Sequence, residues 1–161
     1  MIQIRELEER LLLGMSRPFI SAASSDSNGP QVIGPLWQEM SSKFFGMKLE
    51  RSANPIGVGA MWRDEGFLET GAMIYFAGYE VDELPENHNG LEALTVAKGK
   101  FATVEHSGPM NELPEVITRF YTQQLPESGL ERRVGMDLEI YYESENPNEF
   151  PRVVIAAPLQ N

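Results

Sequence analysis

The sequence contains no cysteine and only two histidines, His88 and His106. Without cysteine, the chain has no disulfide, zinc–thiolate site, iron–sulfur cluster or cysteine nucleophile, and this absence suits a reducing compartment. The histidines lack the spacing of a metal-binding motif, so we expect no metal and no cofactor. No apolar run approaches the roughly 18 residues that cross a membrane, and the polar N-terminus is unlike a signal peptide. We therefore expect a cytoplasmic protein.

Basic residues are scarce: 13 Lys and Arg stand against 24 Asp and Glu, which gives a net charge of −11 and a pI near 4.6. A protein that binds nucleic acid neutralises phosphates with Lys and Arg, so this charge argues against direct contact with DNA or RNA. It argues equally against an anionic membrane surface. An acidic surface still allows a role in protein interaction, for example with a DNA-binding protein.

The hydropathy pattern predicts a single α+β domain over residues 1–161, of which 42% are apolar. Period-2 alternation indicates strands, and apolar residues spaced i, i+4 indicate helices. We expect a strand at 2–19, a helix at 32–46, strands at 56–62, 72–81, 91–96 and 101–106, a helix at 111–125, and strands at 137–143 and 153–159. This order is a duplicated β-α-β-β unit, with pseudo-repeats at about 1–82 and 90–161. Two such units can form one antiparallel sheet with both helices on one face and a cleft between the repeats.

Several segments resemble the GyrI-like effector-binding domains, the drug-sensing domains attached to some AraC- and MerR-type regulators. The segments that carry the resemblance are 33–37, 75–81, 98–108, 112–129, 137–141 and 153–159. The resemblance implies two β-α-β-β units and a hydrophobic pocket for bulky, often cationic, aromatic compounds. It also implies that Glu139 is the polar centre of that pocket. Because one domain accounts for the 161 residues, we expect a stand-alone member without its own DNA-binding segment.

Glu139 shares one strand face with Asp137 and Tyr141, because side chains alternate along a strand. The residues alone allow a solvent-facing glutamate, whereas the resemblance favours a carboxylate in the pocket. A carboxylate walled by aromatic rings has a raised pKa, and a bound cation restores its charged form. The aromatic candidates for the walls are Trp37, Trp62, Tyr75, Phe120 and Tyr141. For each ring taken alone, packing in the core explains its position as well as ligand contact does.

Together with these residues, the resemblance implies a small-molecule-binding domain that captures or senses amphipathic, cationic aromatic compounds, a multidrug type of binding. A regulator protein is the partner that such a sensor implies. One alternative is a hydrolase of electrophilic toxins in which Glu139 is the catalytic group. The other is a protein-interaction role like that of a gyrase inhibitor, which the acidic surface allows. We expect a binding domain rather than an enzyme, because no second acid or nucleophile motif accompanies Glu139.

Overall fold

The computed structural model describes residues 1–22, 24–49, 56–144 and 146–161, and its elements follow the predicted order. The first half contains β1 (Gln3–Leu7), β2 (Arg10–Ile20), α1 (Gly29–Gly46), β3 (Gly57–Arg63), α2 (Phe67–Thr70) and β4 (Ala72–Glu80). The second half contains β5 (Glu92–Val96), β6 (Gly99–Ser107), a 3₁₀ turn η1 (Met110–Glu112), α3 (Leu113–Arg119), a π-helical turn η2 (Phe120–Gln124), α4 (Leu125–Glu127), β7 (Asp137–Tyr142) and β8 (Arg152–Pro158). No helix within these ranges is long and apolar enough to span a membrane.

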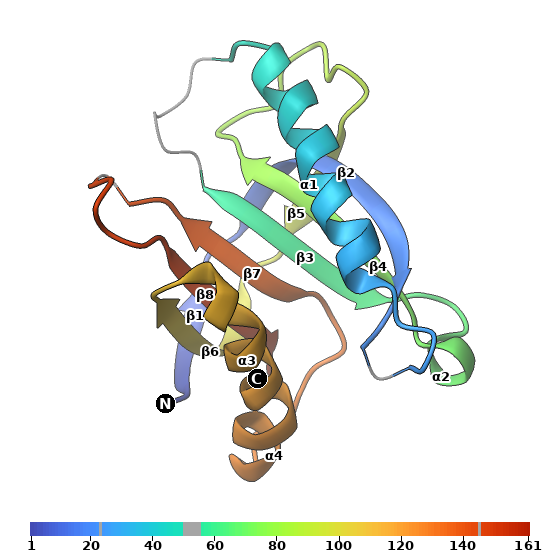
Figure 1. The fold of residues 1–161 in the computed structure, drawn as a ribbon, viewed down its shortest axis with the longest axis vertical. Helices are drawn as coiled ribbons and strands as arrows, with labels where there is room; N and C mark the ends of the chain where they lie inside the picture. Colours follow the sequence, from blue (N-terminus) through green and yellow to red (C-terminus); the bar gives the residue numbers. More distant parts are fainter. Residues whose placement is uncertain (23, 50–55, 145) are drawn as a thin grey trace.

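The eight strands that the described residues form make one antiparallel sheet in the order β1-β6-β8-β7-β3-β4-β2-β5. The sheet curls, and α1 and α3 lie over the same face of it, one on each half (Figure 1). The halves meet where β3 pairs with β7, and Gly59 lies directly opposite Glu139 in that ladder. The predicted α+β fold of duplicated β-α-β-β units is therefore confirmed, and its pseudo-twofold axis passes between β3 and β7.

The predicted strand at 2–19 is wrong in one respect, because it divides at Glu8 and Glu9. β1 pairs with β6 of the second half, whereas β2 pairs with β4 and β5 of the first half. The exchange is mutual, since β5 comes just before β6 in the chain but pairs with β2. The alternation of side chains between the two faces also shifts by one residue at this break. Ile2 and Leu13 both contribute to clusters on the helix-covered face, although they are an odd number of residues apart and would lie on opposite faces of an unbroken strand.

The two faces of the sheet carry separate apolar clusters. On the helix-covered face, α1 buries Leu36, Met40 and Phe44 at the predicted i, i+4 spacing. Burying each of these side chains contributes roughly 1.5–3 kcal/mol. The alternate positions of the strands point to the opposite face, among them Leu138 and Ile140 of β7. Because both faces are buried, the central strands hold apolar residues at nearly every position.

The second predicted helix, at 111–125, forms in pieces, with the π turn η2 between α3 and α4. Pro126 lies inside α4 instead of ending the helix before it. Proline has no N–H, so Pro126 cannot donate the regular backbone hydrogen bond of an α-helix. The π-helical turn η2 lies immediately before α4, where this hydrogen bond is missing.

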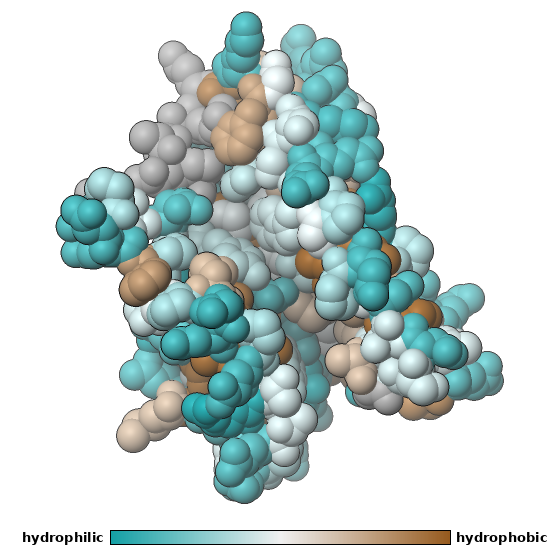
Figure 2. All heavy atoms as spheres, in the orientation of Figure 1, coloured by the Kyte–Doolittle hydropathy of each residue, from teal (hydrophilic) through white to brown (hydrophobic). Residues whose placement is uncertain are grey.

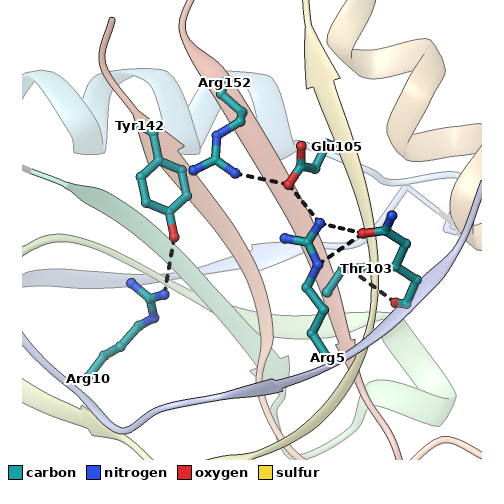
Figure 3. A network of polar contacts seen from close by, with 7 residues as sticks. Arg5, Arg10, Thr103, Glu105, Tyr142 and Arg152 are labelled. Atoms are coloured by element: carbon teal, nitrogen blue, oxygen red, sulfur yellow. Dashed lines mark hydrogen bonds and ion pairs between the residues drawn. The ribbon is translucent and has the colours of Figure 1, made fainter. Parts of the chain in front are cut away.

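A polar network joins the halves on the face without helices (Figure 3). Arg10 of β2 donates a hydrogen bond to the hydroxyl of Tyr142 in β7 across 3.3 Å and also pairs with Glu80. Glu105 of β6 accepts from Arg5 and from Arg152, each across 2.9 Å. The Arg10 side chain is only 14% exposed, so its contacts contribute more than the exposed pairs around Glu105 do.

Candidate ligand-binding site

Two glycines in β3 leave room for aromatic rings on the helix-covered face of the sheet. Gly57 pairs with Tyr79 of β4 on one side and with Tyr141 of β7 on the other. A Cβ added at Gly57 would lie 3.4 Å from the Trp37 ring, and one added at Gly59 would overlap the Tyr75 hydroxyl and lie 2.7 Å from Cζ of that ring. The glycines therefore leave the space that the aromatic rings occupy.

Trp37 of α1 lies across the junction of the two halves. Its ring meets Tyr141 edge to face at a centroid separation of 5.7 Å, and Tyr79 at 6.2 Å. The indole Nε1 donates a hydrogen bond to the hydroxyl of Tyr75, 3.0 Å away. One tryptophan thus connects the helix of the first half with strands from both halves, and edge-to-face contacts of this kind stabilise the arrangement of the rings.

Glu139 lies behind this aromatic group and is 9% exposed. The hydroxyl of Tyr141 donates a hydrogen bond to Oε2 of Glu139 across 3.2 Å. Burial raises the pKa of Glu139 above its usual value, while hydrogen bonds from Tyr141 and Tyr75 act in the opposite direction. Burial and the charge of Glu139 also raise the pKa of Tyr141, which keeps this phenol protonated and able to donate.

Among the residues that the structure describes, no Lys or Arg forms an ion pair with Glu139. Asp137, two positions earlier on the same face, differs in this respect. It accepts hydrogen bonds from Arg132 at 2.7 and 2.8 Å, and although burial raises the pKa of Asp137, the arginine opposes that rise. Glu139 is therefore a buried carboxyl group that, unlike Asp137, has no basic partner among the described residues.

A cavity of about 280 Å³ opens next to these rings, lined by Trp37, Gly57, Tyr79, Tyr141 and Glu143. The surface between α1 and α3 recedes in the view of Figure 2. Glu139 is not among the lining residues, but Tyr141, which donates a hydrogen bond to it, is. A molecule in the cavity would contact three aromatic rings directly. It would also interact electrostatically with Glu139, which lies next to Tyr141.

The structure brings four of the six predicted site residues together, namely Glu139, Tyr141, Trp37 and Tyr75. Trp62 is elsewhere, because it packs against the cluster on the opposite face of the sheet with Val58 and Ala60. Phe120 is fully buried beneath the second-half helices, in the cluster that contains Leu113 and Leu125. Neither Trp62 nor Phe120 lines the cavity.

Three residues of the site were not predicted, and each has a signal in the sequence. Tyr79 lies four positions after Tyr75, and Glu143 four positions after Glu139, so each shares a strand face with a predicted residue. Gly57, in Gly57-Val58-Gly59, lies within a strand, where glycine often marks the close approach of another group.

Within the described part of the chain, no group of three His, Asp or Glu side chains is placed to hold a metal ion. His106 is buried, and its Nε2 lies 3.0 Å from the carbonyl oxygen of Pro109. The chemistry available at the site is that of the buried Glu139 carboxyl group with its phenol donors, the exposed carboxylate of Glu143 and the aromatic faces.

Comparison with known proteins places these features in a family. The family model of the GyrI-like small-molecule-binding domain matches residues 1–159. The transcriptional regulator BrlR of Pseudomonas aeruginosa is 34% identical over 71 residues, which are 44% of this chain and 26% of BrlR. The match thus spans about a quarter of that regulator.

Solved structures share the fold at low identity. The structure of SAV2435 bound to tetraphenylphosphonium superposes with a TM-score of 0.73 at 14% identity, covering 100% of this chain and 94% of the other. A putative transcription regulation protein from Staphylococcus aureus gives a TM-score of 0.64 at 16% identity, covering 100% and 99% of the two chains. The C-terminal domain of EcmrR gives 0.58 at 16% identity, covering 100% and 98%. The chain belongs to the GyrI-like small-molecule-binding domain family.

Proposed function

We propose that this domain captures or senses amphipathic aromatic cations in the cavity between its two halves. The observation that carries the proposal is Glu139, a buried carboxyl group without a basic partner among the described residues, directly behind the aromatic wall of a cavity. A free carboxylate in such a place costs folding free energy, so a position of this kind suits a group that is neutralised by a ligand.

The expected electrostatic and cation–π energies favour a cation over a neutral molecule of the same shape. A unit charge about 7 Å from the carboxylate, at an effective dielectric of about 20, gains roughly 2 kcal/mol. Each aromatic face in contact with the cation adds roughly 0.5–2 kcal/mol. Trp37, Tyr79 and Tyr141 supply those faces, and they constrain the exact shape of the ligand little.

The relatives support this proposal. SAV2435, which has the same fold, was solved with tetraphenylphosphonium, a bulky aromatic cation. BrlR and the Staphylococcus aureus protein are described as transcriptional regulators, and EcmrR was solved on DNA. We extend the proposal to a sensing role in the cytoplasm, with a regulator protein as the partner that receives the signal.

The test compares a cation with a neutral aromatic of similar bulk by isothermal titration calorimetry, using tetraphenylphosphonium and triphenylphosphine oxide. We expect Glu139→Gln to weaken the cation by about tenfold to thirtyfold, the equivalent of roughly 1.4–2 kcal/mol, and to leave the neutral compound within about twofold. Glu69→Gln, an exposed glutamate on α2, is the matched control and should change neither. Equal losses for the two compounds in Glu139→Gln would exclude the charge role.

A second candidate function is hydrolysis of an electrophilic ligand at the same site. It is favoured by the raised pKa of Glu139, which suits a group that takes up or releases a proton, and by the two tyrosine hydroxyls beside it. Mass spectrometry of a reactive aromatic ligand after long incubation separates the two candidates. Turnover that is lost in Glu139→Gln supports the enzyme, and recovery of the intact ligand supports the binding domain.

A further inference from the structure

The cavity has a second carboxylate at its mouth. Glu143 is exposed and lines the cavity together with Tyr141 and Trp37. It follows Glu139 by four residues, and four residues of extended chain span about 13 Å. The phenol ring of Tyr141 comes from the position midway between them, so a negative charge lies at each end of an aromatic surface.

Neither carboxylate has an ion-pair partner within residues 1–22, 24–49, 56–144 and 146–161. Glutamates on other strands do have such partners, as Glu80 of β4 has Arg10 and Glu105 of β6 has Arg152. The two glutamates nearest the cavity thus have no basic partner in these ranges.

We propose that the cavity prefers elongated dications over monocations of the same shape, with Glu143 as the residue that sets this preference. The proposal rests on the proposed function of the same site. The aromatic part of the ligand lies against Trp37, Tyr79 and Tyr141, with its first cationic centre attracted by Glu139. A second cationic centre, on a linker about as long as the spacing of the carboxylates, reaches Glu143.

The two carboxylates contribute unequally. Glu139 is buried, so its attraction is weakly screened by salt, whereas Glu143 is exposed and its attraction falls as ionic strength rises. An exposed ion pair contributes little, and the expected preference is about threefold to fivefold at low salt.

The test uses two compounds that differ only at one end. Each is a triphenylphosphonium with an alkyl linker of about nine or ten methylenes, which spans about 13 Å when extended. The linker ends in trimethylammonium in the dication and in its uncharged tert-butyl isostere in the monocation. Calorimetry at low salt gives the ratio of the two dissociation constants. We expect the wild type to favour the dication by about threefold to fivefold, Glu143→Gln to bring the ratio close to one, and Glu69→Gln to keep the wild-type ratio. The preference should also decline with added salt.

The outcomes separate this inference from the proposed function. If the monocation binds, and weakens in Glu139→Gln, but the wild-type ratio is close to one, the dication preference is wrong and the proposed function stands. The same conclusion follows if Glu143→Gln keeps the wild-type ratio. If the monocation does not bind, or is unaffected in Glu139→Gln, the proposed function is wrong and this inference fails with it.

Discussion

Gly59 and Glu139 lie directly opposite each other in the β3–β7 ladder, at the junction of the two halves. A Cβ at Gly59 would overlap the Tyr75 hydroxyl and approach Oε1 of Glu139 to 3.4 Å. The missing side chain on one strand therefore makes room for the carboxyl group on the other and for one of its phenol donors.

Replacing Gly59 by alanine should consequently displace Tyr75 from Glu139. We expect Gly59→Ala to lower the free energy of unfolding by roughly 1–3 kcal/mol, as overpacking of a buried site does, and to weaken tetraphenylphosphonium binding. Gly46→Ala is the matched control, because Gly46 is the exposed last residue of α1 and a Cβ there meets nothing within 4 Å. It should stabilise the protein by roughly 0.5–1 kcal/mol, as alanine does within a helix. Urea denaturation measures both, and equal behaviour of the two variants would contradict this account of Gly59.

Two neighbouring tyrosines on opposite faces of β7 provide a second comparison. Tyr141→Phe removes a hydrogen bond that favours the charged form of Glu139, so the pKa of Glu139 should rise further. Near neutral pH we expect tetraphenylphosphonium to bind about threefold to tenfold more weakly, because a larger share of Glu139 is protonated and a neutral carboxyl group attracts the cation less. This corresponds to roughly 0.7–1.4 kcal/mol, the net contribution of one ordinary hydrogen bond. Tyr142→Phe removes only the contact with Arg10 and should leave the affinity unchanged. Calorimetry checks both variants, and a similar effect in each would show that the Tyr141 hydrogen bond has no special role.

Stability should depend on pH through Glu139. Its pKa in the folded state lies above the usual 4.5, so the folded protein binds this proton more tightly than the unfolded chain does. Wild-type stability is therefore lost as the pH rises from about 4.5 through the raised pKa. Glu139→Gln has no carboxyl group to ionise and lacks this loss. The free energy of unfolding of the variant relative to the wild type should therefore increase across this pH range, by on the order of 1 kcal/mol. Chemical denaturation across the pH range measures the difference, and parallel curves would contradict the shift.

The two tryptophans should report the ligand differently. Trp37 lines the cavity, whereas Trp62 packs on the other face of the sheet. We expect the fluorescence of Trp62→Phe to change when tetraphenylphosphonium saturates the protein, and that of Trp37→Phe to stay constant. A response that follows Trp62 instead would place the ligand on the face without helices.

The parts of the site that were predicted depend on periodicity within one element. Alternation along β7 puts Glu139 and Tyr141 on one face, and the i, i+4 spacing in α1 fixes its buried stripe. The face on which Trp62 lies could not be predicted in this way. The central strands are buried on both faces, and β3 has no alternation of polar and apolar residues that would distinguish one face from the other. Periodicity also turns Phe120 inward, but it does not separate a core position from a cavity wall.

The exchange of β1 and β5 between the halves could not be predicted from the sequence, for a different reason. It depends on which strands pair, and hydrogen bonding between distant segments leaves little trace in a single sequence. The shift in alternation between Ile2 and Leu13 marks the break in the strand but not the partner that each part takes.

The most direct measurement of the central claim is the pKa of Glu139 itself, followed by the ¹³C shift of its carboxyl carbon in an NMR titration. We predict a pKa above the usual 4.5 in the free protein, because the carboxyl group is buried, and a fall when tetraphenylphosphonium occupies the cavity, because a cation favours the charged form. An ordinary pKa that the ligand leaves unmoved would contradict the role assigned to this residue.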